Sequence, residues 1–130
     1  MANEEQRLID ATCETGTEVV NKFYRFNDKR RHEIGNLYID TAVALWNGNI
    51  LQGNMNITKF YQDLPTSTHS VTSVDCQPIS DDSTMRLLIS VEGIVQFEGM
   101  GPQNFSQIFI LARQMDSVWK ITNDCYRYFE

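Results

Sequence analysis

One acidic residue of the sequence stands in a setting that could support acid–base chemistry. Asp124 lies in the last apolar segment, and alternation over 118–129 places it on the same face as Tyr126 and Tyr128. Segments with helical spacing supply three more tyrosines, Tyr24, Tyr38 and Tyr61. A carboxylate among hydroxyl groups can act as a general base. More often it is a buried polar group that the hydroxyls satisfy by hydrogen bonding, and we expect that role here.

Other catalytic or metal-binding patterns are not evident in the sequence. His32 and His69 are far apart, so they show no recognisable metal-ligand spacing. The chain contains no GxGxxG, P-loop or GxSxG motif. Cys13, Cys76 and Cys125 form neither a CxxC pair nor a disulfide framework, which predicts free thiols in a reducing compartment. We therefore expect a protein that is not an enzyme and holds no cofactor or metal.

Composition and charge narrow the classes of partner. A chain of 130 residues with 42% hydrophobic residues predicts one globular domain over 1–130. The net charge of −6 argues against binding to nucleic acid. The basic cluster at 29–32 is expected to be a solvated helix surface, with a phosphate contact or a contact with an acidic partner as alternatives. No segment approaches the roughly 18 apolar residues of a membrane span, and the polar start argues against a secretory signal.

Helical spacing dominates the first part of the chain. Apolar residues recur every three or four positions in the first segment, at Ile9, Cys13, Gly16, Val20 and Phe23. Asn27-Asp28 interrupts this pattern and is predicted to cap a second, short helix. "TAVALW" and "NILQG" flank Asn47-Gly48, a strong hairpin signal, so Trp46 is expected to pack as part of a turn. "MNITKFYQDL" returns to helical spacing, and Pro65 ends it.

Strands are predicted for the remainder of the chain. Four runs, at roughly 70–79, 85–97, 104–113 and 118–129, are separated by short turn-like segments. Such short connections favour antiparallel neighbours, because a parallel connection needs a crossover of about a dozen residues or more. Helices followed by a large antiparallel sheet predict an α+β fold.

The predicted sheet has two apolar faces. A sheet with one solvated face alternates apolar and polar residues cleanly, and these strands do not. The helices can cover one face. The other face is expected to expose Ile108, Ile110, Ile121 and Cys125, interrupted by Asn123 and Arg127. A mixed apolar face of this kind predicts an interaction surface, and the alternative is that turns and chain ends fold over it.

Several motifs in the same order resemble a known family. "LYID…LWNG", "LPTSTHSVTSVDCQP", "FSQIFILA" and "VWKITNDCYRY" resemble the nuclear transport factor 2-like family along nearly the whole chain. "DKRRHEIGNLY", together with "ALWNGN" and "VDCQP", is more narrowly similar to its export-subunit branch. The resemblance implies a cone, in which a strongly curved antiparallel sheet wraps round the N-terminal helices. Members of this fold pair through the outer face of the sheet.

The resemblance also implies a function and a set of contact residues. It implies a non-enzymatic adaptor that heterodimerises with the large subunit of a nuclear RNA export receptor. The pair would bind FG-repeat nucleoporins and carry messenger RNA through the nuclear pore, shuttling between nucleus and cytoplasm. Arg127 matches an arginine that pairs with an aspartate of the large subunit, a charge-assisted contact. The other interface residues carried over are Cys125, Asn123, Ile108 and Ser90, with Asp75 and Gln77 at the same surface.

One departure from the family bears on the alternatives. The transport factor that carries the small GTPase Ran has a glutamate directly after the tryptophan of the hairpin, where this chain has Asn47. The acidic pair of a later loop is also not evident in "FEGMGPQN". We therefore expect no Ran binding. A homodimeric importer of Ran-GDP remains the first alternative. An enzyme that uses the cone cavity is the second, because this fold also hosts ketosteroid isomerase and dehydratases.

Overall fold

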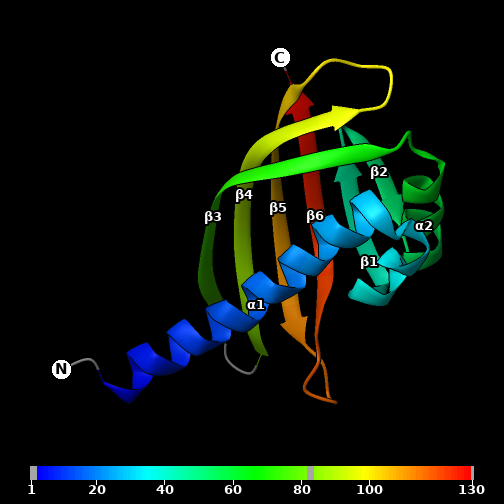
Figure 1. The fold of residues 1–130 in the computed structure, drawn as a ribbon. Helices are drawn as coiled ribbons and strands as arrows, with labels where there is room; N and C mark the ends of the chain where they lie inside the picture. Colours follow the sequence, from blue (N-terminus) through cyan, green and yellow to red (C-terminus); the bar gives the residue numbers. More distant parts are fainter. Residues whose placement is uncertain (1–2, 82–83, 130) are drawn as a thin grey trace.

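Helices and one short hairpin come first, and four long strands complete the chain. The computed structural model describes residues 3–81 and 84–129. Along the chain the elements are α1 (Glu4–Lys29), the 3-10 helix η1 (Arg31–Leu37), β1 (Tyr38–Trp46), β2 (Asn49–Gln52), α2 (Asn54–Asp63), β3 (Ser67–Asp81), β4 (Thr84–Phe97), β5 (Gln103–Arg113) and β6 (Trp119–Phe129). Figure 1 shows α1 crossing one face of a curved sheet, with α2 beside β1 and β2 at one end. The predicted α+β cone is confirmed.

The first helix is longer than the sequence pattern predicts. Asn3 caps its start, since its side chain accepts a hydrogen bond of 2.9 Å from the backbone N–H of Gln6. The predicted cap at Asn27-Asp28 is wrong, because both residues lie inside α1, which continues to Lys29. η1 begins without a side-chain cap. The Asp28 carboxylate bonds to β3 instead, so it is not available to the start of η1. No helix among the described residues is long and apolar enough to cross a membrane.

The six strands form one sheet in the order β2-β1-β6-β5-β4-β3. The four long strands, β3 to β6, pair antiparallel with one another in chain order, as predicted. β1 and β6 are parallel, a pairing that the sequence analysis did not anticipate. Everything between these two strands acts as the crossover, which satisfies the length that a parallel connection requires.

The predicted hairpin at Trp46-Asn47-Gly48 is confirmed. Asn47 and Gly48 both have positive φ, 46° and 86°, as a two-residue primed turn requires. The side-chain oxygen of Asn47 accepts a hydrogen bond of 3.0 Å from the backbone N–H of Tyr128, which ties the turn to β6. The Trp46 ring stacks on Tyr126, with 5.6 Å between ring centroids. Trp46 is therefore a packing residue.

The sheet curls where β3 and β4 bend together (Figure 1). The register between them shifts from Val71 to Ser73, which marks a bulge. Gly93 faces this bulge, and a Cβ atom there would lie 2.2 Å from the carbonyl oxygen of Ser70 and 2.8 Å from the ring of Phe105. Only glycine permits so close an approach, so this position helps to set the curvature.

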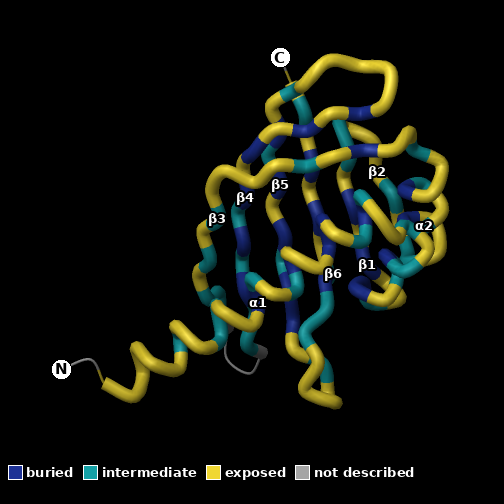
Figure 2. Tube along the Cα trace, viewed as in Figure 1, coloured by how far each residue is buried: buried dark blue, intermediate teal, exposed yellow. Residues whose placement is uncertain are grey.

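Aromatic rings fill the concave side of the sheet. Phe23 of α1 makes edge-to-face contacts with Tyr24, Tyr61 and Phe109, at centroid distances of 5.2, 5.7 and 5.0 Å. Buried and exposed residues alternate along β4 and β5 (Figure 2), which places one set of side chains in this core and the other set outside.

One residue predicted for the outer face lies in the core. Ile121 is fully buried, with 0% of its side chain exposed. The register between β5 and β6 shifts here: Ile110 is opposite Asn123, while Leu111 is opposite Ile121. Thr122 is thus an extra residue, and it reverses the alternation on its N-terminal side. Ile108, Asn123, Cys125 and Arg127 lie beyond the bulge and keep their predicted orientation.

Candidate functional site: the outer face of the sheet and the polar interior behind it

Asp124 projects into the concave side and is saturated with hydrogen bonds. Its Oδ2 accepts from the hydroxyls of Tyr38 at 2.6 Å and Tyr61 at 3.0 Å. Its Oδ1 accepts from Nε2 of Gln107 at 2.6 Å, and Gln107 in turn accepts from the hydroxyl of Tyr24 at 2.7 Å. Burial raises the pKa of Asp124 to about 6, although these three hydrogen bonds oppose the rise. Both carboxylate oxygens are occupied, which favours a satisfied core group over a general base.

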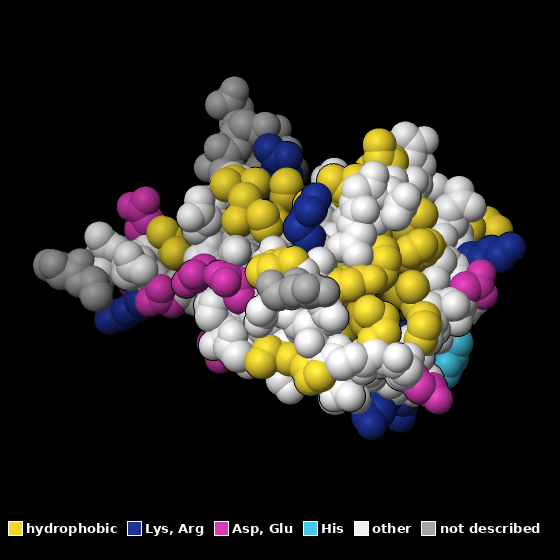
Figure 3. Space-filling view, turned by 90° about the horizontal axis from the view of Figure 1, so that it is seen from above, with side chains coloured by type: hydrophobic (Ala, Val, Ile, Leu, Met, Phe, Trp, Pro, Cys, Tyr) yellow, Lys and Arg dark blue, Asp and Glu magenta, His cyan; other side chains and the backbone are white. Residues whose placement is uncertain are grey.

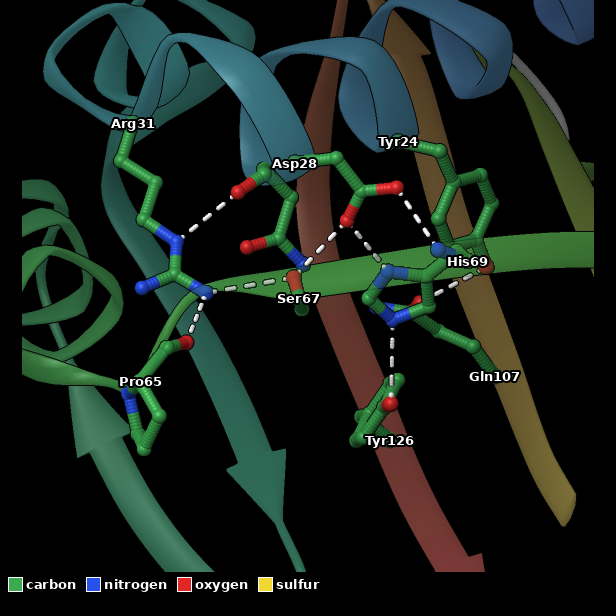
Figure 4. Close-up of polar contacts among 9 residues, drawn as sticks. Tyr24, Asp28, Arg31, Pro65, Ser67, His69, Gln107 and Tyr126 are labelled. Atoms are coloured by element: carbon green, nitrogen blue, oxygen red, sulfur yellow. Dashed lines mark hydrogen bonds and ion pairs between the residues drawn. The ribbon is translucent and has the colours of Figure 1, made fainter. Parts of the chain in front are cut away.

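A second polar cluster joins the end of α1 to the start of β3 (Figure 4). The backbone N–H of His69 donates to Oδ2 of Asp28 at 2.7 Å, and the hydroxyl of Ser67 donates to Oδ1 at 2.8 Å. His69 Nδ1 also lies 2.7 Å from Oδ1, and Nε2 lies 3.1 Å from the hydroxyl of Tyr126. Burial acts to raise the pKa of Asp28, but the bonds from His69 and Ser67 lower it overall. Asp28 thus holds the backbone and the ring of His69, and the other ring nitrogen is in hydrogen-bond contact with Tyr126.

Sequence reasoning missed the role of His69, because it considered histidines only as metal ligands. The polar pair Asn27-Asp28 at the end of an apolar helix pattern indicated a polar contact at this position. The residue that Asp28 binds, His69, lies 41 residues further along the chain, so the sequence alone did not identify it. Among the residues that the structure describes, no group of three or more His, Cys, Asp or Glu side chains could hold a metal ion.

Arg31 anchors the helical end of the cone. Its guanidinium donates to the backbone carbonyl oxygens of Asn27, Leu64 and Pro65. Figure 4 shows the contact with Pro65. The prediction of a solvated surface at 29–32 is therefore wrong for Arg31, which is half-buried, and correct for the other three residues. The turn of η1 directs this one side chain at the carbonyls that follow α2, where a cation is favourable.

The residues predicted to contact a partner share the outer face of the sheet. Five cross-strand partners form a row across β1, β6, β5, β4 and β3: Leu45, Cys125, Ile108, Ser90 and Asp75. Residues in register on neighbouring strands project from the same face. The sequence therefore placed four of its predicted residues in one continuous row, which we call the central row.

A second row runs beside the central row, two residues away along each strand. It consists of Val43, Asn123, Ile110, Leu88 and Gln77. The residues of the two rows that lie on β1, β5 and β6 line a hollow of about 210 Å³. Three aliphatic side chains around it stay well exposed, with 36% of Val43, 37% of Leu45 and 43% of Ile108 accessible. The outer face thus carries an apolar depression at its centre.

Arg127 lies on the opposite side of the central row from this second row. It is exposed and stands opposite Ser106 in the register of β5 and β6. Within the described part of the chain it makes no ion pair or side-chain hydrogen bond. In the view from above, hydrophobic side chains gather in patches beside isolated basic side chains, while acidic side chains line the projecting end of α1 (Figure 3). All five donors of Arg127 are available to a partner.

Comparisons with known proteins agree with this architecture. The model of the nuclear transport factor 2 (NTF2) domain matches residues 15–128. NTF2-related export protein 1 of Bos taurus is 38% identical over 126 residues, which cover 92% of this chain and 90% of that protein. Nuclear transport factor 2 from Cryptosporidium parvum superimposes with a TM-score of 0.79 and 26% identity, over 88% of this chain and 92% of that one.

A third protein shares the fold alone. Candida albicans Mtr2, solved in complex with the Mex67 M domain, superimposes with a TM-score of 0.70 and 12% identity, over 86% of this chain and 92% of the matched chain. Relatives identified by sequence include transport factors and export proteins. The chain belongs to the nuclear transport factor 2 family and, within it, to the NTF2-related export proteins.

Proposed function

We propose that this chain is a single-domain, non-enzymatic adaptor that binds a nuclear RNA export receptor through the outer face of its sheet. The proposal is carried by one observation: an apolar hollow lies beside Arg127 on the outer face of the sheet, and Arg127 has no ion pair or side-chain hydrogen bond with any described residue. Its export-protein relatives support a transport role. The complex of Mtr2 with the Mex67 M domain offers a precedent, within the same fold, for assembly with a second protein.

The partner surface follows from the chemistry of this face. Burying Val43, Leu45 and Ile108 against a second apolar sheet would gain about 25 cal/mol for each Å² removed from water. A carboxylate on the partner would satisfy Arg127 in a charge-assisted, bidentate contact. Two copies of this chain would instead bring like charges together across a two-fold axis, which favours a heterodimer over a homodimer. We therefore assign the partner an NTF2-like sheet with an acidic residue facing Arg127.

The wider role extends from this pairing. By covering the sheet of the receptor, the adaptor would stabilise it while the pair binds FG-repeat nucleoporins and moves messenger RNA through the nuclear pore. This role places the protein in the nucleus and at the pore, with passage to the cytoplasm. The side-chain oxygen of Asn47 bonds to the backbone of β6, so this position supports the turn and supplies no carboxylate for Ran.

Size-exclusion chromatography with light scattering tests the pairing. The chain is run alone and after co-expression with the C-terminal region of a candidate receptor. We expect a one-to-one complex, and we expect Arg127→Glu to weaken it by about 100-fold, because the change removes one charge contact and leaves the facing carboxylate opposed. Lys59→Glu is the matched control: it reverses a charge on the exposed side of α2, away from the sheet face, and is expected to bind normally.

Each other outcome points to a different function. A homodimer that ignores the receptor and binds Ran-GDP would contradict the proposal and favour the import factor. A monomer whose melting temperature rises with a small apolar ligand would favour an enzyme that uses the cone cavity. If the complex forms equally well with Arg127→Glu, the partner is correctly identified but the contact does not involve the outer face around Arg127.

A further inference from the structure

Two of the three cysteines, Cys13 on α1 and Cys76 on the edge strand β3, pack against the same core where α1 meets the sheet. Gly16 of α1 lies directly over β4, since a Cβ atom there would approach Leu87 to 2.6 Å and Ile89 to 3.0 Å. Ile89 is the cross-strand partner of Cys76 on β3. Cys13 precedes Gly16 by three residues and so lies on the same helix face one turn earlier. Helix position and strand register therefore place Cys13 and Cys76 on the same side of the contact between α1 and the sheet.

The environment of the two thiols agrees with this placement. Both side chains are half-buried and pack against the same hydrophobic core. Burial raises the pKa of the Cys76 thiol to about 12, and the neighbouring Cys13 side chain contributes to the rise. Cys125 differs in both respects, because it is exposed and lies on the outer face of the sheet.

We propose that Cys13 and Cys76 form a dithiol that a peroxide converts into an intramolecular disulfide, which clamps α1 to the edge strand β3. The reaction balances with hydrogen peroxide as the oxidant. The Cys13 thiolate attacks one peroxide oxygen, the O–O bond breaks, and water leaves after protonation, so Cys13 becomes a sulfenic acid. The sulfur of Cys76 then displaces the hydroxyl group from that sulfur, and a second water forms. Two thiols lose two electrons and two protons to the peroxide.

The clamp would act where α1 is least anchored. The buried residues of α1 begin at Gly16, and its first turns project beyond the sheet (Figure 1). A disulfide at Cys13 would hold the helix at the point where burial starts. Cys76 also stands between Asp75 and Gln77, whose side chains are exposed on the outer face. The same bond would therefore restrain the strand that borders the central row.

Oxidation of the reduced, full-length chain tests the pair directly. After treatment with hydrogen peroxide, intact mass should fall by about 2 Da, and peptide mapping after alkylation should recover residues 13 and 76 in one linked peptide. The melting temperature should rise by about 10 °C and return when a thiol reductant is added, as expected for closing a long loop. Cys125→Ser should behave like the unmodified chain, whereas Cys76→Ser should show neither change.

Mapping of the unmodified chain decides the proposal even if a variant fails to fold. Oxidation that appears only at Cys125, as a dimer or as an overoxidised thiol, would overturn it. Recovery of Cys13 and Cys76 as alkylated thiols after treatment that oxidises Cys125 would do the same.

Discussion

Charged side chains on the inner and outer faces of the sheet differ in whether they have partners within the chain. On the inner side, the carboxylates of Asp28 and Asp124 accept hydrogen bonds at both of their oxygens. On the outer side, Arg127 has no partner among the residues that the structure describes, and Ile108 and Leu45 remain well exposed at the centre of the sheet. Within this chain, the two carboxylates inside the cone have hydrogen-bond partners, whereas the outer face exposes apolar and charged side chains that a second protein could cover. Changes inside should therefore alter folding, and changes outside should alter binding.

The largest effect is expected from Asp28→Ala. This change leaves the backbone N–H and the ring of His69 and the hydroxyl of Ser67 without their acceptor in a half-buried site. We expect the free energy of unfolding to fall by about 4 kcal/mol. Urea denaturation measures it, and Asp63→Ala, which removes an exposed carboxylate, should stay within about 0.5 kcal/mol. Equal losses for both variants would contradict a structural role for the cluster.

Asp124 should give stability an unusual pH dependence. Its pKa in the folded protein is about 6, above the ordinary value, so the native state holds a proton that the unfolded chain releases. Its contribution is complete below about pH 4, falls as pH rises through 6, and amounts to about 3 kcal/mol. Asp28 has the opposite effect, because its pKa is lowered in the folded protein. Its contribution to stability is present at pH values above its ordinary pKa and is lost as the pH falls below that value.

Denaturation at a series of pH values measures this dependence. We expect stability to decline between about pH 4 and 7 in the unmodified chain. Asp124→Asn removes the titrating group and should flatten the decline over that interval. An unchanged slope in Asp124→Asn would assign the pH dependence to another residue.

The sequence predicted the parts of the fold that depend on local patterns. Helical spacing located α1 and α2, and Asn47-Gly48 located the hairpin, because each is determined by residues close together in the chain. Alternation also oriented Ile108 and Arg127 correctly, because the register of β5 and β6 is continuous from both residues to Ile110 and Asn123, and the bulge comes only at Thr122.

Features set by distant contacts were not predictable in this way. The bulge at Thr122, which turns Ile121 inward, has no glycine or other local signature. The parallel pairing of β1 with β6 depends on strands at opposite ends of the chain. The bond from Asp28 to His69 likewise became visible only when α1 and β3 were placed together. In each case the partner of a residue, rather than the residue itself, determined its role.

On the outer face, Ile108→Ala should test whether the hollow matters for binding. Removing an aliphatic side chain from the centre of an interface should weaken the receptor complex by about tenfold, with little change in unfolding. Ile94→Ala is a matched control, because Ile94 has the same exposure of 43% but lies further along β4, outside the hollow. Isothermal titration with the receptor compares the two. Similar losses from both variants would argue against a central hot spot.

The smallest effect is expected from Asp75→Asn. Asp75 ends the central row on β3, the edge strand, so it should lie at the rim of the interface. Rim charges are solvated and influence the association rate more than the strength of the complex. We expect about a twofold change in the association rate at low salt, which should disappear as salt screens the charge. Surface plasmon resonance at two ionic strengths measures it. A loss of affinity above tenfold would instead place β3 at the centre of the interface. The partner would then cover the β3 edge of the sheet as well as the region around β6.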